Sequence, residues 1–314
     1  MKLLGFLFLI LEFSSLSHGL FWGKPDYSKA RKLLAEIRVY RTSGDCQSVV
    51  EKYEEFLMEK PPLDIKKEAY LFAGECYEKE NAMEKAISIY KLASELYPAD
   101  PVFFRKASSL YLENGFYQSA LELLLKLEKK YPYDEKNWLP LARAWRGLGF
   151  LRKAVPYYRK AAAIDLRNYS LLMEYCLALK EGSFFTEGYG LALKGYEYSG
   201  NIEFALLAAE ISALSGSLQN SISLLRGLEN KGLCSLKCEK MLVVYSFFSG
   251  DLLAASDRLE KLKEDPDFHF FIEGLIYWRN GEKNRAFSSF SKSALSKDPF
   301  LKKASENFLK EAKK

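Results

Sequence analysis

A small residue recurs along this chain at almost constant intervals, and this interval limits what the chain can fold into. The positions are Gly44, Asn81, Gly115, Gly149, Gly182, Gly216, Gly250 and Gly281. Successive steps of 37, 34, 34, 33, 34, 34 and 31 residues separate them. Self-similarity at this period is typical of a repeat array in which each helical hairpin packs against its neighbours. The sequence therefore predicts an all-α chain with one tight turn in each repeat.

The residues around each turn also repeat. The second repeat places the following residues on either side of Asn81: Tyr70, Ala73, Gly74, Tyr77, Ala86, Tyr90, Ala93 and Pro98. The fourth and eighth repeats keep the same order, with Trp145 and Tyr277 as the aromatic residue before the turn. Small residues such as Gly74 and Ala86 let the two helices of a hairpin approach closely, and aromatic side chains fill the space beside them. These aromatic stripes are therefore predicted to be core.

This pattern resembles the tetratricopeptide repeat (TPR) family, in which two aromatic positions and a small pair precede the turn and an Ala-x3-aromatic sequence follows it. The match extends over residues 27–299, although Glu273 stands where the family usually has an apolar residue. The resemblance implies an all-α, right-handed superhelical solenoid of about eight helix–turn–helix repeats. The repeats are expected at 27–61, 66–98, 100–132, 134–166, 168–200, 201–233, 235–266 and 267–299. We expect a capping helix at 300–314, with apolar residues at 301, 304 and 308.

The N-terminus has a different character. Lys2 is followed by an apolar run of nine residues, Leu3–Leu11, and then by small residues at Ser17 and Gly19. This order is typical of a secretory signal peptide over residues 1–19, cleaved before Leu20. The apolar run is shorter than the roughly 20 residues that span a bilayer.

A signal peptide implies that the mature chain is exported to the periplasm or is associated with the cell envelope, with residues 20–26 as a short linker. Two features favour an alternative, in which the N-terminal segment stays uncleaved and anchors the chain. Lys2 is the only basic residue before the apolar run, and Glu12 stands at the end of this run.

The chain has five cysteines, and export would make their pairing important. Cys46 begins the second helix of the first repeat, and Cys76 lies late in the first helix of the next. Neighbouring helix axes are usually 8–10 Å apart, whereas a disulfide needs Cα atoms within about 7 Å, so the spacing leaves this disulfide open. Cys234 and Cys238 form a second candidate pair, which would close a small loop. Cys176 stands where the repeat pattern places a small buried residue.

Catalysis, metal binding and nucleic-acid binding find little support. The only histidines are His18 and His269, which is too few for a histidine-based relay once the signal peptide is removed. The cysteines lack the further ligands of a zinc site, and Gly188, Gly190 and Gly195 do not follow a strand as a phosphate-binding loop must. The net charge of +5 is spread among interspersed acids and bases. We expect no enzyme, cofactor, metal, nucleic acid or small-molecule substrate.

The predicted binding surface is the concave groove that the first helices of the hairpins line in a TPR-like solenoid. Near the N-terminus this groove is charged, and its candidate binding residues are Arg38, Arg143 and Arg146. Near the C-terminus it is apolar, because the seventh repeat also places Val244 and Phe248 there. The candidate binding residues at this end are Phe247, Phe268, Phe271, Leu275 and Trp278. The last four lie three, four and three residues apart, so they form one stripe on a helix. The packing residues of this helix are expected on its other face, at Phe270, Gly274 and Tyr277.

A helix that is apolar on both faces is either covered on both or has a partner for one of them. One interpretation is that the capping helix and the seventh repeat cover the stripe. In the other, the stripe binds a protein or peptide. We therefore expect an exported scaffold that holds an extended or helical segment of a partner in envelope assembly, secretion or export. The alternative is a structural subunit whose groove is filled by a neighbouring chain, and peripheral membrane association also stays open.

The signal peptide can be tested on protein produced in its own host. We expect mass spectrometry to find an N-terminus at or close to Leu20, because the small residues before it form the cleavage site. A membrane-bound chain that still begins at Met1 or Lys2 would instead establish the uncleaved anchor.

Overall fold

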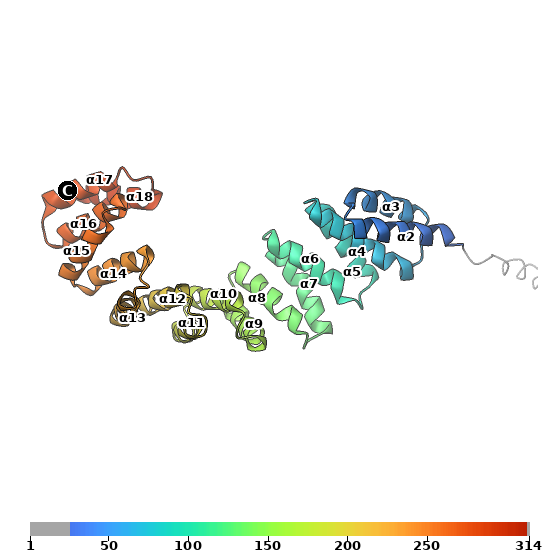
Figure 1. The fold of residues 1–314 in the computed structure, drawn as a ribbon, viewed down its shortest axis with the longest axis horizontal. Helices are drawn as coiled ribbons and strands as arrows, with labels where there is room; N and C mark the ends of the chain where they lie inside the picture. Colours follow the sequence, from blue (N-terminus) through green and yellow to red (C-terminus); the bar gives the residue numbers. More distant parts are fainter. Residues whose placement is uncertain (1–25, 313–314) are drawn as a thin grey trace, which may run out of the picture. The chain divides into compact units, whose positions relative to one another are not determined.

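The computed structural model describes residues 26–312, and every regular element in this part of the chain is helical (Figure 1). The all-α prediction is confirmed, while the predicted signal peptide lies outside the described residues. The helices are α2 (Ser28–Ser43), α3 (Cys46–Met58), α4 (Leu63–Lys79), α5 (Met83–Leu96), α6 (Pro101–Glu113), α7 (Tyr117–Lys130), η2 (Glu135–Asn137), α8 (Trp138–Gly147), α9 (Leu151–Ile164), α10 (Tyr169–Glu181), α11 (Phe185–Ser199), α12 (Ile202–Leu214), α13 (Leu218–Asn230), α14 (Leu236–Ser249), α15 (Leu252–Leu259), η3 (Glu260–Leu262), α16 (Pro266–Arg279), α17 (Lys283–Ser293) and α18 (Pro299–Ala312).

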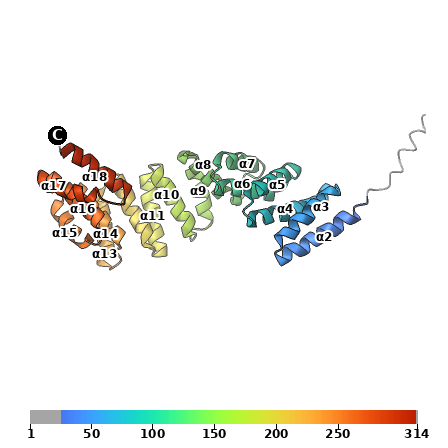
Figure 2. The same cartoon turned by 90° about the horizontal axis from the view of Figure 1, so that it is seen from above.

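The helices form two compact units, and the boundary between Ala144 and Trp145 falls inside α8. In unit 1, α2 to α7 pack as successive antiparallel hairpins, and each hairpin also packs against the next. In unit 2, α9 to α17 follow the same plan, and α18 lies against α17 and α16 (Figures 1 and 2). No helix within residues 26–312 has the length and apolar character that crossing a membrane requires.

The turns between the paired helices have left-handed backbone conformations, as the recurring small residues predict. Gly44 has φ 80° and Asn81 has φ 57°, and five other recurring glycines also have positive φ: Gly115, Gly149, Gly216, Gly250 and Gly281. Glycine and asparagine are the residues that adopt this conformation most readily. The sequence therefore located the turn residue correctly in seven of the eight repeats.

The fifth turn corrects the prediction by one residue. Gly182 has φ −82°, and the left-handed residue is Ser183, with φ 60°. Packing explains why position 182 is nevertheless glycine, because a Cβ atom there would come within 2.5 Å of the Phe184 ring. The recurring small residue is thus required by a left-handed backbone conformation in seven turns, and by close contact with an aromatic ring in this one.

Close approach of paired helices depends on small residues, as the sequence indicates. Gly74 of α4 faces the ring of Tyr90, which is fully buried on α5, and a Cβ atom on Gly74 would overlap that ring. The same relation joins Gly274 of α16 to Phe290 of α17, where the added Cβ would come within 2.7 Å of the ring. Each aromatic ring therefore occupies the space that a side chain on the facing residue would need.

The disulfide between Cys46 and Cys76 joins the start of α3 to the last turns of α4. The two Cα atoms are 5.0 Å apart, within the range that a disulfide requires. The bond therefore links the first hairpin to the second. Cys176 is the free cysteine among the described residues, and burial raises the pKa of its thiol to about 12.

Two glycines of α11 provide a matched test of this packing. A Cβ atom on Gly195 would come within 2.5 Å of the Phe204 ring, whereas one on Gly190 would have no neighbour within 4 Å. We expect Gly195→Ala to destabilise unit 2 by about 1–3 kcal/mol through overpacking. Gly190→Ala should be neutral or stabilise it by up to about 1 kcal/mol, because alanine is the better helix former. Urea unfolding followed by circular dichroism measures both, and equal effects would contradict this account.

Candidate functional site

The charged residues on the first helices of the early hairpins mostly pair with one another. Arg38 of α2 forms a bidentate ion pair with Glu68 of α4, and Arg41 pairs with Glu75 at 3.0 Å. In unit 2, Arg146 forms a bidentate pair with Glu181 of α10, and Lys180 pairs with Glu210 of α12 at 2.9 Å. Each of these bonds joins the first helix of one hairpin to the first helix of the next.

Two of the three arginines that were predicted to bind a partner, Arg38 and Arg146, take part in these pairs. Hydrogen bonding to Glu68 raises the pKa of Arg38, and hydrogen bonding to Glu181 raises the pKa of Arg146. Arg143 is exposed on α8 and also has an interaction within the chain. Arg38 and Arg143 belong to unit 1, whereas the predicted aromatic stripe belongs to unit 2. Arg38 and Arg146 therefore connect repeats.

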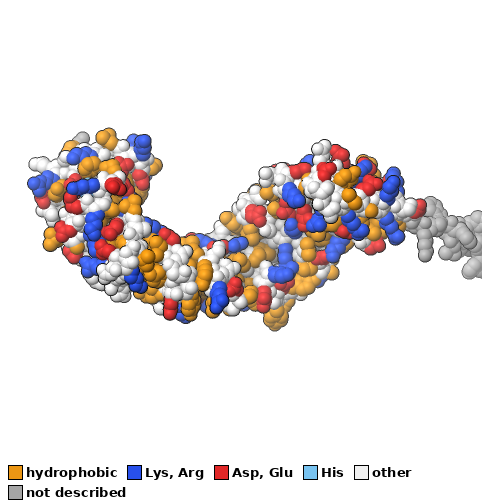
Figure 3. All heavy atoms as spheres, in the orientation of Figure 1, with side chains coloured by type: hydrophobic (Ala, Val, Ile, Leu, Met, Phe, Trp, Pro, Cys, Tyr) orange, Lys and Arg blue, Asp and Glu red, His pale blue; other side chains and the backbone are white. Residues whose placement is uncertain are grey.

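The last two hairpins carry apolar residues at the corresponding positions. Three residues before the turn, where earlier hairpins have Arg41, Arg146 and Lys180, α14 has Phe247 and α16 has Trp278. Hydrophobic side chains gather on the inner side of these C-terminal hairpins in Figure 3. The change from charged to apolar side chains distinguishes this part of the chain.

The structure brings all five predicted apolar residues together around one cavity of about 810 Å³. Phe247 comes from α14, and the other four come from α16: Phe268, Phe271, Leu275 and Trp278. Phe247 is buried, whereas the four on α16 are only half-buried. The stripe is therefore neither fully enclosed in the core nor fully exposed.

The third wall of this cavity is α18, which the sequence predicted as a capping helix and, in one interpretation, as a cover for the stripe. Its contributions to the lining are Phe300, Leu301, Ala304 and Phe308. The ring of Phe308 stacks on Phe290 of α17 at 4.7 Å between centroids and lies edge-on to Phe271 and Trp278. The capping helix thus contacts part of the stripe, at Phe271 and Trp278, and leaves a cavity beside it.

Four more residues of α14 and α16 line the cavity. Val244 and Phe248 of α14 were predicted to face the groove, whereas Ile272 and Arg279 of α16 were missing from the prediction. Val244 stands six residues before its turn, at the position where α2 has Arg38. The contribution of α18 depends on how this helix folds back, and the repeat pattern carries no signal for it.

The core-facing side of α16 differs in part from the prediction. Gly274 is buried as expected, but the other buried residues of α16 are His269, Ile272 and Ile276. Phe270 and Tyr277 are only half-buried. The reason is that α16 packs against α15, η3 and α17 together, so its buried surface extends around the helix beyond one stripe.

Arg279 is the one charged residue in the lining of the cavity. Its Nη1 atom donates a hydrogen bond of 2.7 Å to the carbonyl oxygen of Phe247, and its guanidinium lies 5.3 Å from the centre of the Phe247 ring. This bond places a cation at the C-terminus of α14, where the helix dipole favours it. Arg279 forms no ion pair with the described residues.

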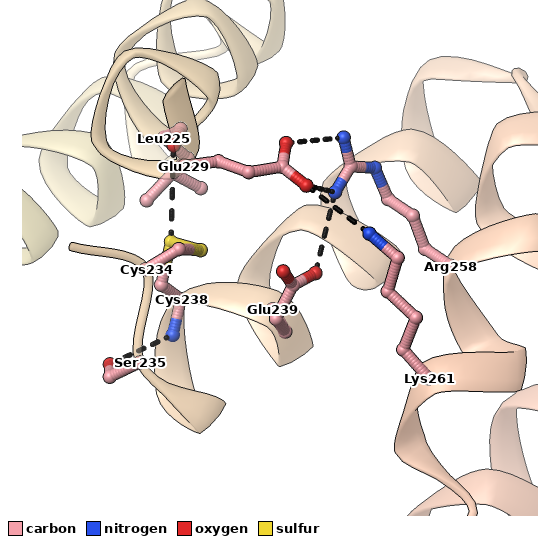
Figure 4. The surroundings of a disulfide bond; sticks show 8 residues. All are labelled: Leu225, Glu229, Cys234, Ser235, Cys238, Glu239, Arg258 and Lys261. Carbon is pink, nitrogen blue, oxygen red and sulfur yellow. Dashed lines mark hydrogen bonds and ion pairs between the residues drawn. A yellow bond between two sulfur atoms is a disulfide. The ribbon is translucent and has the colours of Figure 1, made fainter. Parts of the chain in front are cut away.

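The helix α14 is fixed at its other end by a disulfide and an ion-pair cluster (Figure 4). The disulfide between Cys234 and Cys238 closes the turn into α14, with Cα atoms 5.2 Å apart. Arg258 of α15 pairs with Glu229 of α13 at 2.8 Å and with Glu239 of α14 at 3.3 Å. Hydrogen bonding to Arg258 lowers the pKa of Glu229. One wall of the cavity is therefore held at both ends.

The cavity has no chemistry suited to catalysis. His269 is buried, with Nδ1 3.1 Å from the carbonyl oxygen of Leu259, and it does not line the cavity. No group of three or more potential metal ligands occurs among residues 26–312. What the arrangement offers is a largely apolar surface with one cation at its edge.

Comparisons with known proteins address the fold. A family model described as tetratricopeptide repeat matches residues 25–183, and no curated protein matches the sequence. The crystal structure of a tetratricopeptide repeat protein from Parabacteroides merdae ATCC 43184 is 14% identical, with a TM-score of 0.52, over 91% of this chain and 100% of that one.

Two further solved structures are similar over a shorter stretch. MamA from Desulfovibrio magneticus RS-1 is 16% identical over 54% of this chain and 94% of that one, with a TM-score of 0.48. YrrB, described as a TPR protein with an unusual peptide-binding site, is 14% identical over 58% of this chain and 91% of that one, also with a TM-score of 0.48. At such identities the similarity concerns the fold alone.

The contacts of α18 can be tested with two of its phenylalanines. We expect Phe308→Ala to lower the free energy of unfolding of unit 2 by about 1–3 kcal/mol, because it removes a partly buried ring stacked on Phe290. Phe300 is 74% exposed, so Phe300→Ala should change stability by less than about 0.5 kcal/mol. Denaturant titration compares the two variants. If Phe308→Ala were as stable as Phe300→Ala, the packing of α18 on α16 and α17 would be wrong.

Proposed function

This chain belongs to the tetratricopeptide repeat family, and we propose that it is a non-catalytic scaffold that holds a helical or extended segment of a partner protein. The proposed binding site is the cavity between α14, α16 and α18. One observation carries this proposal. Positions that carry internally paired charges in several earlier hairpins carry aromatic and aliphatic residues in the last two, and these residues line an apolar cavity.

Energetics supports binding at this place. Phe248 is 62% exposed and Phe300 is 74% exposed, both at the edge of the cavity. A concave apolar surface of this kind gains free energy when a partner covers it, at about 25 cal/mol for each Å² removed from water. One of the surrounding helices, α14, is fixed by a disulfide and an ion pair, so this wall requires little ordering before binding.

We further propose that the partner is met outside the cytoplasm. The signal-peptide pattern of residues 1–19 supports export to the periplasm or envelope, and the cysteine pairs agree with an oxidising compartment. In this setting the scaffold would serve envelope assembly, secretion or export. A second copy of the chain could also fill the cavity, which would make the protein a structural subunit of a homo-oligomer.

The proposed site can be tested by cross-linking in the native host, followed by purification and mass spectrometry. We expect Phe248→Ala and Trp278→Ala to weaken binding of the captured partner by about 30-fold each, as for aromatic hot spots of about 2 kcal/mol. Tyr133→Ala is the matched control, because Tyr133 is 88% exposed in unit 1 and should leave capture unchanged.

Two results would contradict the proposed function. Equal capture by all three variants would place the binding surface elsewhere on the chain. A concentration-independent oligomer that Phe248→Ala converts to monomer, as seen by analytical ultracentrifugation, would show that a second copy fills the cavity.

A further inference from the structure

The lining of the cavity restricts the backbone conformation of an occupant. Twelve of its thirteen residues are apolar, and the carbonyl oxygen of Phe247 already accepts a hydrogen bond from Arg279. An extended peptide would bring N–H and C=O groups into a surface that offers them almost no partners. Each group left unpaired costs about 1–3 kcal/mol. A helix satisfies these groups within its own backbone, so it can present only side chains to the cavity.

The chain itself shows that a helix suits this surface. Leu301, Ala304 and Phe308 of α18 follow one another at three and four residues and line the cavity from one side. Phe308 lies against Phe271 and Trp278 of α16. The apolar residues of α16 are themselves spaced as one face of a helix, so a second helix can pack along them as α18 does.

Charge at the edge of the cavity restricts the occupant further. Arg279 is exposed and forms no ion pair with any residue that the structure describes, and the cavity lining contains no acidic side chain. Lys302 and Lys303, beside Leu301 on α18, are also exposed and lack ion pairs within residues 26–312. A guanidinium has five N–H donors, and only one of these in Arg279 donates to Phe247. The remaining donors are suited to a carboxylate.

We propose that the occupant is an amphipathic helix of a partner protein whose apolar stripe enters the cavity and whose flanking Asp or Glu pairs with Arg279. This inference rests on the proposed function and adds the conformation and charge of the bound segment. Arg279 is then the residue that sets specificity, because the apolar walls accept many large side chains, whereas an acidic flank is favoured by charge.

The test is selection of a displayed library of random 16-residue peptides on the full chain and on Arg279→Glu. We expect the wild-type chain to enrich peptides with apolar residues at helical spacing and an acidic residue beside them. Arg279→Glu should enrich Lys or Arg at that flank instead. In fluorescence anisotropy, Arg279→Glu should bind the peptide selected on the wild-type chain at least tenfold more weakly. A peptide in which the acidic residue is replaced by Lys or Arg should restore binding to Arg279→Glu. Arg226→Glu is the control, because Arg226 is exposed on α13 and does not line the cavity.

Other outcomes would overturn the inference and separate it from the proposed function. One such outcome is the enrichment of proline-rich peptides, of peptides with alternating apolar residues, or of peptides without acidic residues. If their binding still requires Trp278, the acidic helix is refuted and the binding site is kept. Peptides that bind equally to Trp278→Ala would refute both. If no peptide is enriched, the inference fails, and binding of dodecanoate in that case would identify a hydrocarbon chain as the occupant.

Discussion

Contact between a glycine and an aromatic ring on the facing helix sets the packing of the second and eighth hairpins, and the candidate site depends on the eighth. The two pairs are Gly74 with Tyr90 and Gly274 with Phe290. Because the ring fills the space that a Cβ atom would need, the two helices cannot rotate or slide without either a clash or a void. This contact fixes the register of these two hairpins, and hence which residues of their first helices face the core, the next hairpin or solvent.

Once the register is fixed, residues at equivalent positions perform equivalent tasks in successive repeats. The ion pairs of Arg41 with Glu75 and of Lys180 with Glu210 each connect one first helix to the next through residues three and six positions before their turns. Each is partly exposed and contributes little stability by itself. These ion pairs matter for function, because charged side chains that the sequence predicts to be free for a partner are already paired within the chain. The aromatic residues that stand at these positions in α14 and α16, Phe247 and Trp278, line the cavity instead, and the candidate site therefore lies at the C-terminal end.

The cavity exists because α18 has two tasks. A terminal repeat must cover the apolar face of its neighbour, and Phe308 does so through its stack on Phe290. The same helix leaves Phe300 exposed and contributes Leu301 and Ala304 to the lining of the cavity. At the far side, Arg279 holds the end of α14 through the carbonyl oxygen of Phe247 and brings a cation to the edge of an otherwise apolar surface. Cap and binding wall are thus one element.

The sequence by itself determined the all-α repeat fold, seven of the eight turn residues and the apolar stripe of α16, because these follow from local backbone preference and helical periodicity. It misplaced the left-handed residue of the fifth turn by one position. Gly182 is small because the Phe184 ring lies against it, and Ser183 adopts the left-handed conformation. Only the tertiary structure decided that Arg38 and Arg146 join repeats, that His269 is buried and that α18 forms a wall of the cavity. Each of these depends on contacts between residues far apart along the chain, which a periodic pattern within one repeat does not specify.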